Sequence, residues 1–211
     1  MNRAAMILWS AGLLAVTTAG ARTIVLTQTD TTMIASIGRE HPFSSWMTGE
    51  YTAGYFGMGD LIASPQAAVL LQFSTDRIPK AQRIVSAELA IPVHIQPAVG
   101  TRLCVWRLLA GWGPGVSYVY RQVRPERLRW ANPGGRGPGV DRAVVPTRVF
   151  VFPTVPREAR VDVTADVQLW YRGTAPNHGW MISTEDDGTG VPLLPPLQGY
   201  SWTLQMTYEP E

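Results

Sequence analysis

From residue 22 to the end of the chain, short runs of β-branched and aromatic residues are separated by Gly, Pro, Asn and Asp. Residues 69–73 form an apolar run of strand length, which indicates a buried strand. Residues 200–208 alternate between apolar and polar side chains, as a strand with one buried face does. About ten such segments at near-regular spacing are typical of a β-sandwich or a β-barrel. We therefore expect an all-β fold of antiparallel strands.

Three segments add detail to this expectation. Residues 164–172 have apolar side chains at helical spacing, so we predict one short helical segment with Thr164 as its N-cap. Residues 84–94 alternate as a strand does, and Pro92 near their end predicts an edge position or a bulge. Residues 191–199 are rich in Pro and are expected to form a loop.

The composition limits the classes of protein to which the chain can belong. It has 211 residues, of which 45% are hydrophobic and 16% charged, enough for one domain with a proper core. Lys80 is the only lysine, which argues against long helices rich in Glu and Lys. The formal net charge of +2 is too small for a strongly cationic nucleic-acid-binding protein, so we expect no nucleic-acid partner.

Cys104 is the only cysteine of the chain. No intramolecular disulfide can form, and a zinc site built from cysteines is excluded. Because Cys104 lies between Leu103 and Val105 in an apolar run, we predict a buried core residue and not a reactive thiol.

The first residues have the features of a secretory signal peptide. A short start with Arg3 leads into the apolar residues 4–19, and residues 19–21 fit the small-residue cleavage pattern. We therefore predict a signal peptide over residues 1–21 and a secreted, extracellular protein. Its single mature domain would cover residues 22–211 and have no membrane contact after cleavage. An uncleaved anchor is the alternative for the N-terminal segment.

Most of the chain between residues 31 and 207 carries motifs in a fixed order. They are VLLQF at 69–73, RIP at 77–79, IVSAEL at 84–89, VWR and GW within 105–112, W…NPGG…GVD within 130–141, and DVT…V…W…G…NHGW within 162–180. Together they resemble the motifs of DNRLRE domains, which are secreted jelly-roll modules related to the family 96 carbohydrate-binding modules. Ser74 stands where that family has Asp.

This resemblance implies an antiparallel β-sandwich of jelly-roll type that binds an extracellular or cell-surface polysaccharide. It also implies a structural Ca²⁺, because sandwich modules of this broad type frequently hold one. Calcium takes loop carboxylates and carbonyl oxygens as ligands. The candidate ligands are Asp30, Asp60 and Asp186. Solvated turn carboxylates are the alternative, since no DxDxDG loop is present.

No motif predicts an enzyme. The histidines His41, His94 and His178 lack metal-binding spacing, and neither a GxSxG motif nor a P-loop occurs. Residues 185–187 supply neighbouring carboxylates of the kind that glycoside hydrolases use. The Gly-Thr-Gly that follows at 188–190 favours a solvated turn instead. We therefore predict a non-catalytic module.

Aromatic side chains that stack on sugar rings are the first candidate site. Residues 47–60 form a Gly-rich loop in which aromatic side chains are difficult to bury. The aromatic platform predicted in this region consists of Trp46, Tyr51, Tyr55 and Phe56. A small core under a long loop is the alternative. Trp112, Tyr118 and Tyr120 lie near Arg121 and form a second predicted groove. Because Trp112 lies on a family-matched motif, a core position is its alternative.

A basic segment is the last candidate. Its arginines are Arg121, Arg124, Arg127, Arg129 and Arg136. Arginine binds carboxylates and sulfates bidentately, so the segment can meet an acidic polysaccharide, with a solvated basic loop as the alternative. The leading hypothesis for the whole chain is polysaccharide binding. The alternative is a structural subunit of an extracellular matrix or surface that binds a separate extracellular protein through the aromatic region.

Overall fold

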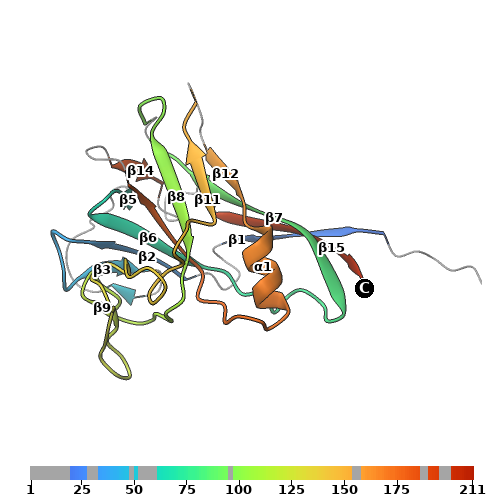
Figure 1. Ribbon diagram of the computed structural model, residues 1–211, viewed down its shortest axis with the longest axis horizontal. Coiled ribbons are helices and arrows are strands. Elements are labelled where there is room, and N and C mark those ends of the chain that lie inside the picture. The colour runs from blue at the N-terminus through green and yellow to red at the C-terminus, as the bar shows by residue number, and fades with distance from the viewer. Residues whose placement is uncertain are drawn as a thin grey trace, which may run out of the picture.

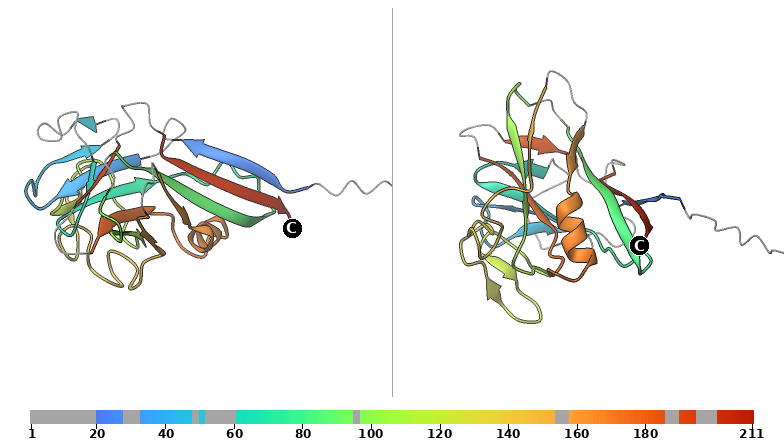
Figure 2. Two further views of the ribbon diagram at one scale, coloured as in Figure 1. Left: turned by 90° about the horizontal axis from the view of Figure 1, so that it is seen from above. Right: turned by 45° about the vertical axis from the view of Figure 1, so that its right-hand side comes forward.

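The computed structural model describes residues 20–27, 33–47, 50–51, 61–94, 97–153, 158–185, 190–194 and 201–211. These residues form antiparallel sheets and one short helix (Figure 1), which confirms the all-β class expected from the sequence. Two main sheets face each other as the layers of a sandwich (Figure 2). None of the helices formed by the described residues has the length and apolar character needed to cross a bilayer.

The sandwich consists of a four-stranded and a seven-stranded sheet. The smaller sheet contains, in spatial order, β1 (Arg22–Thr27), β15 (Thr203–Pro210), β7 (Gln82–Pro92) and β12 (Glu158–Asp162). The larger sheet contains β11 (Arg148–Val151), β8 (Arg102–Arg107), β13 (Trp180–Thr184), β6 (Ala67–Gln72), β2 (Met33–Gly38), β3 (Ser45–Met47) and β4 (Glu50–Tyr51). Two short pairs accompany them: β5 (Leu61–Ala63) with β14 (Val191–Leu193), and β9 (Tyr120–Gln122) with β10 (Leu128–Arg129).

The strand order is that of a jelly roll. The eight strands that give this order are divided equally between the two sheets: β1, β7, β12 and β15 in the smaller one, and β6, β8, β11 and β13 in the larger one. As a result β15 lies between β1 and β7, and β13 lies between β6 and β8. The last two long strands therefore occupy central positions and close the fold, while β2, β3 and β4 extend the larger sheet beyond β6.

Alternate residues of the strands fill the space between the sheets. Val69 and Leu71 of β6 are buried there, together with Phe73 just after the strand. Trp180 and Trp202 are the largest fully buried side chains of the described residues. Burial of such side chains contributes about 25 cal/mol per Å² of apolar surface, so this layer dominates the stability of the fold.

The larger sheet is also buried on its other face. A second apolar cluster there contains Leu70 of β6, Cys104 and Trp106 of β8, and Trp112 and Trp130 from the long connection between β8 and β11. That connection covers the sheet as an additional layer, which we call the outer layer. Because both faces are covered, strands such as β6 are apolar at successive positions and do not alternate. Cys104 is buried, as predicted.

The outer layer is organised around the buried Asp141. Its carboxylate accepts hydrogen bonds from the backbone N–H groups of Ala131 (2.9 Å), Asn132 (2.8 Å) and Gly137 (3.0 Å). A Cβ atom at Gly137 would lie 2.7 Å from the Asp141 Oδ2 atom, so glycine is required there. One side chain thus closes the Gly-rich segment into a fixed loop, against which Trp130 packs.

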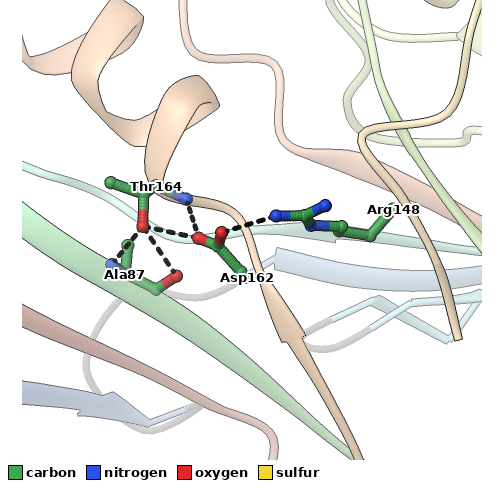
Figure 3. A network of polar contacts seen from close by, with 4 residues as sticks. All are labelled: Ala87, Arg148, Asp162 and Thr164. Carbon is green, nitrogen blue, oxygen red and sulfur yellow. Dashed lines mark hydrogen bonds and ion pairs between the residues drawn. The ribbon is translucent and has the colours of Figure 1, made fainter.

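The helix α1 (Thr164–Tyr171) begins in a network of polar contacts next to β7 (Figure 3). The Asp162 carboxylate accepts hydrogen bonds from the Thr164 hydroxyl (2.6 Å), the Thr164 N–H (2.9 Å) and Arg148 (2.8 Å). These bonds, the one from the Thr164 hydroxyl foremost, lower the pKa of Asp162 to about 2. The network ties β12, α1 and β11 together.

Thr164 is the first helical residue, and Val163 occupies the N-cap position, so the prediction of Thr164 as N-cap is wrong. Two competing contacts explain the difference. The Thr164 hydroxyl accepts a hydrogen bond from the Ala87 N–H of β7 at 2.8 Å and donates one to the Asp162 carboxylate at 2.6 Å, so it caps no N–H group of the helix.

Further along the helix, the buried Asp166 joins α1 to the larger sheet. Its Oδ1 atom lies 3.1 Å from Nε of Arg107 in β8. Its Oδ2 atom accepts hydrogen bonds from the Thr147 hydroxyl (2.6 Å) and from Nε1 of Trp180 in β13 (2.8 Å). Both oxygen atoms of the carboxylate therefore have polar partners, as a buried charge requires.

Two further details differ from the sequence-based expectation. Pro92 is the last residue of β7, which lies between β15 and β12 and not at an edge. At a strand end the missing N–H of proline costs no bond within the ladder. Residues 191–193 form the strand β14 instead of a loop, and the carbonyl of Pro192 accepts a hydrogen bond from the His94 N–H at 3.0 Å.

Candidate functional site

The predicted aromatic platform lies largely outside the described residues. The backbones of Trp46 and Tyr51 belong to β3 and β4, and the register of these strands places the two residues opposite each other. Their side chains, and Tyr55 and Phe56 as whole residues, lie outside what the structure describes. The platform stays a prediction in which backbone pairing brings two of its members together.

The carboxylates predicted to bind Ca²⁺, Asp30, Asp60 and Asp186, also fall outside the described residues. In the described part of the chain, no three His, Cys, Asp or Glu side chains lie close enough to hold a metal ion. Calcium binding therefore stays a prediction from the sequence.

Trp112 is a core residue, which corrects the expectation that it lines a groove. Only 6% of the residue is exposed, within the apolar cluster under the outer layer. Its Nε1 atom donates a hydrogen bond to the His178 carbonyl at 2.9 Å. Because the sheet and the outer layer enclose the ring, neither of its faces is available to stack on a sugar.

Tyr118 and Arg121 are both half-buried and help to hold the outer layer together. The Tyr118 carbonyl accepts a hydrogen bond from the Gly134 N–H at 2.6 Å, and a Cβ atom at Gly134 would meet the Tyr118 ring. The Arg121 guanidinium donates to the Gly111 carbonyl at 2.6 Å. Since neighbours along a strand point to opposite faces, Arg121 lies on the other face of β9 from Tyr120.

The β9–β10 hairpin projects from the end of the molecule (Figures 1 and 2). Its base is fixed by backbone hydrogen bonds from the Ser117 N–H to the Tyr120 carbonyl (2.7 Å) and from the Trp130 N–H to the Val119 carbonyl (3.3 Å). The strand register places Arg129 opposite Tyr120. A hairpin with a fixed base presents its side chains in a defined arrangement.

A group of aromatic and cationic side chains lies on this hairpin and the neighbouring turn, with the half-buried Tyr120 at its centre and exposed side chains around it. The guanidinium carbons of Arg127 and Arg129 lie 5.3 Å and 5.6 Å from the centre of the Tyr120 ring, at cation–π distances. The ring of Phe43, which is 72% exposed, lies 6.2 Å from the same centre. We call Phe43, Tyr120, Arg127 and Arg129 the arginine–tyrosine surface.

Contacts at the base connect the two chain segments of this surface. The Val119 N–H donates to the Pro42 carbonyl at 3.0 Å, and the Ser45 hydroxyl donates to the Val116 carbonyl. The turn that carries Phe43 is therefore tied to the hairpin that carries Tyr120. Two guanidinium groups held beside one ring offer several N–H donors at a fixed spacing, an arrangement suited to carboxylates or sulfates.

The arginines of the basic segment have different roles. Arg127 and Arg129 belong to the arginine–tyrosine surface, and Arg124 is exposed on the same hairpin. Arg136 donates to the Ser64 carbonyl at 3.0 Å, and its burial lowers the pKa of its guanidinium. Arg136 therefore connects the outer layer to the loop before β6, and is a structural residue.

Sequence reasoning missed Phe43, and it associated Tyr120 with Trp112, Tyr118 and Arg121 and not with Arg127 and Arg129. Phe43 has a weak local signal, a large aromatic residue within the polar turn of residues 39–45. Arg127 and Arg129 have a stronger signal, because side chains two residues apart in an extended segment point to the same side. A comparison with known proteins adds nothing to these observations: no family model and no curated protein matches the sequence.

Proposed function

We propose that this protein is a secreted, non-catalytic module that binds an acidic polysaccharide through the arginine–tyrosine surface. The observation that carries the proposal is the position of two exposed guanidinium groups beside one tyrosine ring, at 5.3 Å and 5.6 Å. The signal-peptide pattern and the resemblance to DNRLRE domains, both sequence-based, support the extracellular setting and the class of ligand.

The physical basis is preorganisation. An arginine side chain loses up to about 2 kcal/mol of rotamer entropy when a ligand immobilises it. Contact with Tyr120 restricts Arg127 and Arg129 before any ligand arrives, so less of this cost falls on binding. Phe43 adds an exposed apolar ring beside the charges, which can cover a C–H face of a sugar. Charge and stacking together favour a glycan that carries carboxylate or sulfate groups.

The test is native affinity electrophoresis of the secreted protein in gels that contain polygalacturonate or neutral hydroxyethylcellulose. We expect polygalacturonate to retard the wild type. The double variant Arg127→Gln/Arg129→Gln should lose most of this retardation, at least about tenfold in affinity, because two charge-assisted contacts are removed.

The matched control is Arg83→Gln/Arg160→Gln on the four-stranded sheet, which changes the net charge by the same amount at exposed residues. Its retardation by polygalacturonate should equal that of the wild type. Equal loss in both variants would show that only overall charge matters and would refute the proposed surface. No retardation of the wild type in either gel would favour the structural subunit that binds protein.

A further inference from the structure

A separate cavity lies where β2 begins and β6 ends. Its volume is about 280 Å³, and its lining residues are Met33, Gln72, Ser74, Thr75, Asp76 and Asn177. Phe43 of the arginine–tyrosine surface follows the opposite end of β2, so the two sites are distinct. Except for Met33, every lining side chain can form hydrogen bonds.

One wall of the cavity is held rigidly by Asn177. Its Nδ2 atom donates to the Phe73 carbonyl at 2.7 Å, and its Oδ1 atom accepts the Gly179 N–H at 3.1 Å. The Nε2 atom of Gln72 donates to the Asn177 carbonyl at 2.9 Å. These bonds fix the carboxamide of Gln72, which is itself a lining residue of the cavity.

The opposite wall is the turn that follows Phe73. The Ser74 hydroxyl accepts the Asp76 N–H at 3.1 Å, and the Thr75 carbonyl accepts the N–H of the buried Ile78 at 3.1 Å. The turn is thus anchored in the core and carries the half-buried Thr75 and the exposed Asp76, both of which line the cavity. Within the described residues, Asp76 forms no ion pair.

The chemistry of the lining selects the class of ligand. A volume of about 280 Å³ lies just below the range of about 300–1,000 Å³ typical of drug-sized ligands, which is enough room for one small ring. A carboxylate, a carboxamide oxygen and hydroxyl groups suit a partner with several hydroxyls, and Met33 supplies an apolar contact for C–H groups. Calcium favours several carboxylates, and Asp76 is the only carboxylate of the lining.

We propose that this cavity binds a single neutral sugar unit, with Asp76 accepting hydrogen bonds from its hydroxyls. The inference goes beyond the proposed function, because it concerns a neutral ligand and residues that the arginine–tyrosine surface does not use. Bonds from hydroxyls to an ionised carboxylate are about twice as strong as neutral ones, so Asp76 is the main contributor.

The test is ligand-observed saturation-transfer NMR with the methyl glycosides of glucose, galactose and mannose, added one at a time to the full chain. We expect at least one glycoside to bind. Asp76→Asn should weaken that binding at least about tenfold, because the variant keeps the shape but removes the charge. Glu88→Gln, which removes an exposed carboxylate from β7, is the matched control and should bind as the wild type does.

The outcomes separate this proposal from the proposed function. Arg127→Gln/Arg129→Gln should lose polygalacturonate binding and keep glycoside binding, whereas Asp76→Asn should do the reverse. The cavity proposal is overturned if none of the three glycosides binds the wild type, or if Asp76→Asn binds as tightly as Glu88→Gln. It is also overturned if added Ca²⁺ alone displaces the bound glycoside, because the cavity would then be a cation site.

Discussion

At the scale of single residues, two buried carboxylates join separate segments of the chain through polar contacts. Asp141 collects three backbone N–H groups of the outer layer, and Asp166 connects α1 with β8 and β13. A buried carboxylate of this kind is tolerated because its oxygen atoms accept hydrogen bonds from the donor groups around them. A substitution that keeps the size but changes the hydrogen-bonding pattern tests this account directly.

Asp141→Asn should lower the free energy of unfolding by about 2–3 kcal/mol, since the introduced NH₂ group meets backbone N–H donors and leaves them unsatisfied. Urea denaturation measures the change. Asp162→Asn is the matched control, because the Asp162 side chain is 54% exposed and solvent screens its contacts, which limits its loss to about 1 kcal/mol or less. Equal losses in the two variants would contradict the structural role given to Asp141.

His178 makes stability depend on pH. Burial, and then the charge of Arg121, lower the pKa of His178 below its usual 6.5. The unfolded chain therefore binds the proton first, and stability is complete above about pH 6.5 and falls as the pH decreases through the folded-state pKa. Asp162, with its pKa of about 2 against 3.8, loses its contribution only at lower pH.

His178→Gln should therefore remove part of the loss of stability seen between about pH 7.5 and about pH 5. Urea midpoints measured across this interval check the prediction. An unchanged pH dependence in the variant would show that the half-buried imidazole is not responsible for it.

At the scale of elements, the larger sheet depends on close approach between strands. Gly179, just before β13, has a φ of +74°, and a Cβ atom there would overlap the carbonyl oxygen of Leu71 in β6. At Gly179 the chain therefore passes so close to β6 that no side chain fits at this position. The Gly179 N–H also donates a hydrogen bond to Oδ1 of Asn177. The segment that leads into β13 therefore also positions a residue that lines the cavity.

Comparison of Gly179→Ala with Gly173→Ala separates the cost of steric overlap from the cost of a positive φ. Gly173 also has a positive φ, of +68°, but a Cβ atom there would meet nothing within 4 Å. Its substitution should cost about 1–2 kcal/mol, the conformational term alone. Gly179→Ala should cost on the order of 4 kcal/mol or prevent folding. Urea denaturation and the yield of soluble protein measure the difference, and similar costs at the two positions would be inconsistent with the close approach.

At the scale of the whole molecule, the net charge is small, and positive charge is concentrated in one segment. The formal net charge is only +2, yet the β9–β10 hairpin carries Arg124, Arg127 and Arg129 with Glu126 as its one acid. A long-range attraction of the whole protein for anions is therefore weak. Binding of an acidic glycan should come from short-range contacts at the hairpin, together with the moderate field of these few charges.

Salt should distinguish the two proposed ligands. Retardation by polygalacturonate should decrease strongly as salt rises from about 0.1 M to about 1 M, where the Debye length falls from about 10 Å to about 3 Å. Binding of a neutral methyl glycoside in the cavity should change little over the same range. Electrophoresis and saturation-transfer NMR at the two salt concentrations test this, and parallel decreases would argue against a neutral ligand.

The sequence by itself determined the elements and the core of this protein. Local periodicity located most of the long strands and α1, because the alternation of apolar residues depends only on which face is buried. Burial of Cys104 followed from the apolar run in which it lies. Local patterns also misplaced some features, such as Thr164, since a threonine at a helix start can serve a neighbouring strand instead of the cap.

Only the tertiary structure decided how the outer layer is arranged and what it exposes. Trp112 and Tyr120 are both aromatic residues of the same connection, yet the first is buried and the second lies beside two arginines. Phe43 joins Tyr120 from a distant segment, and the cavity combines residues from β2, β6 and the segment before β13. Such juxtapositions depend on long-range contacts, which leave no periodic trace in the sequence.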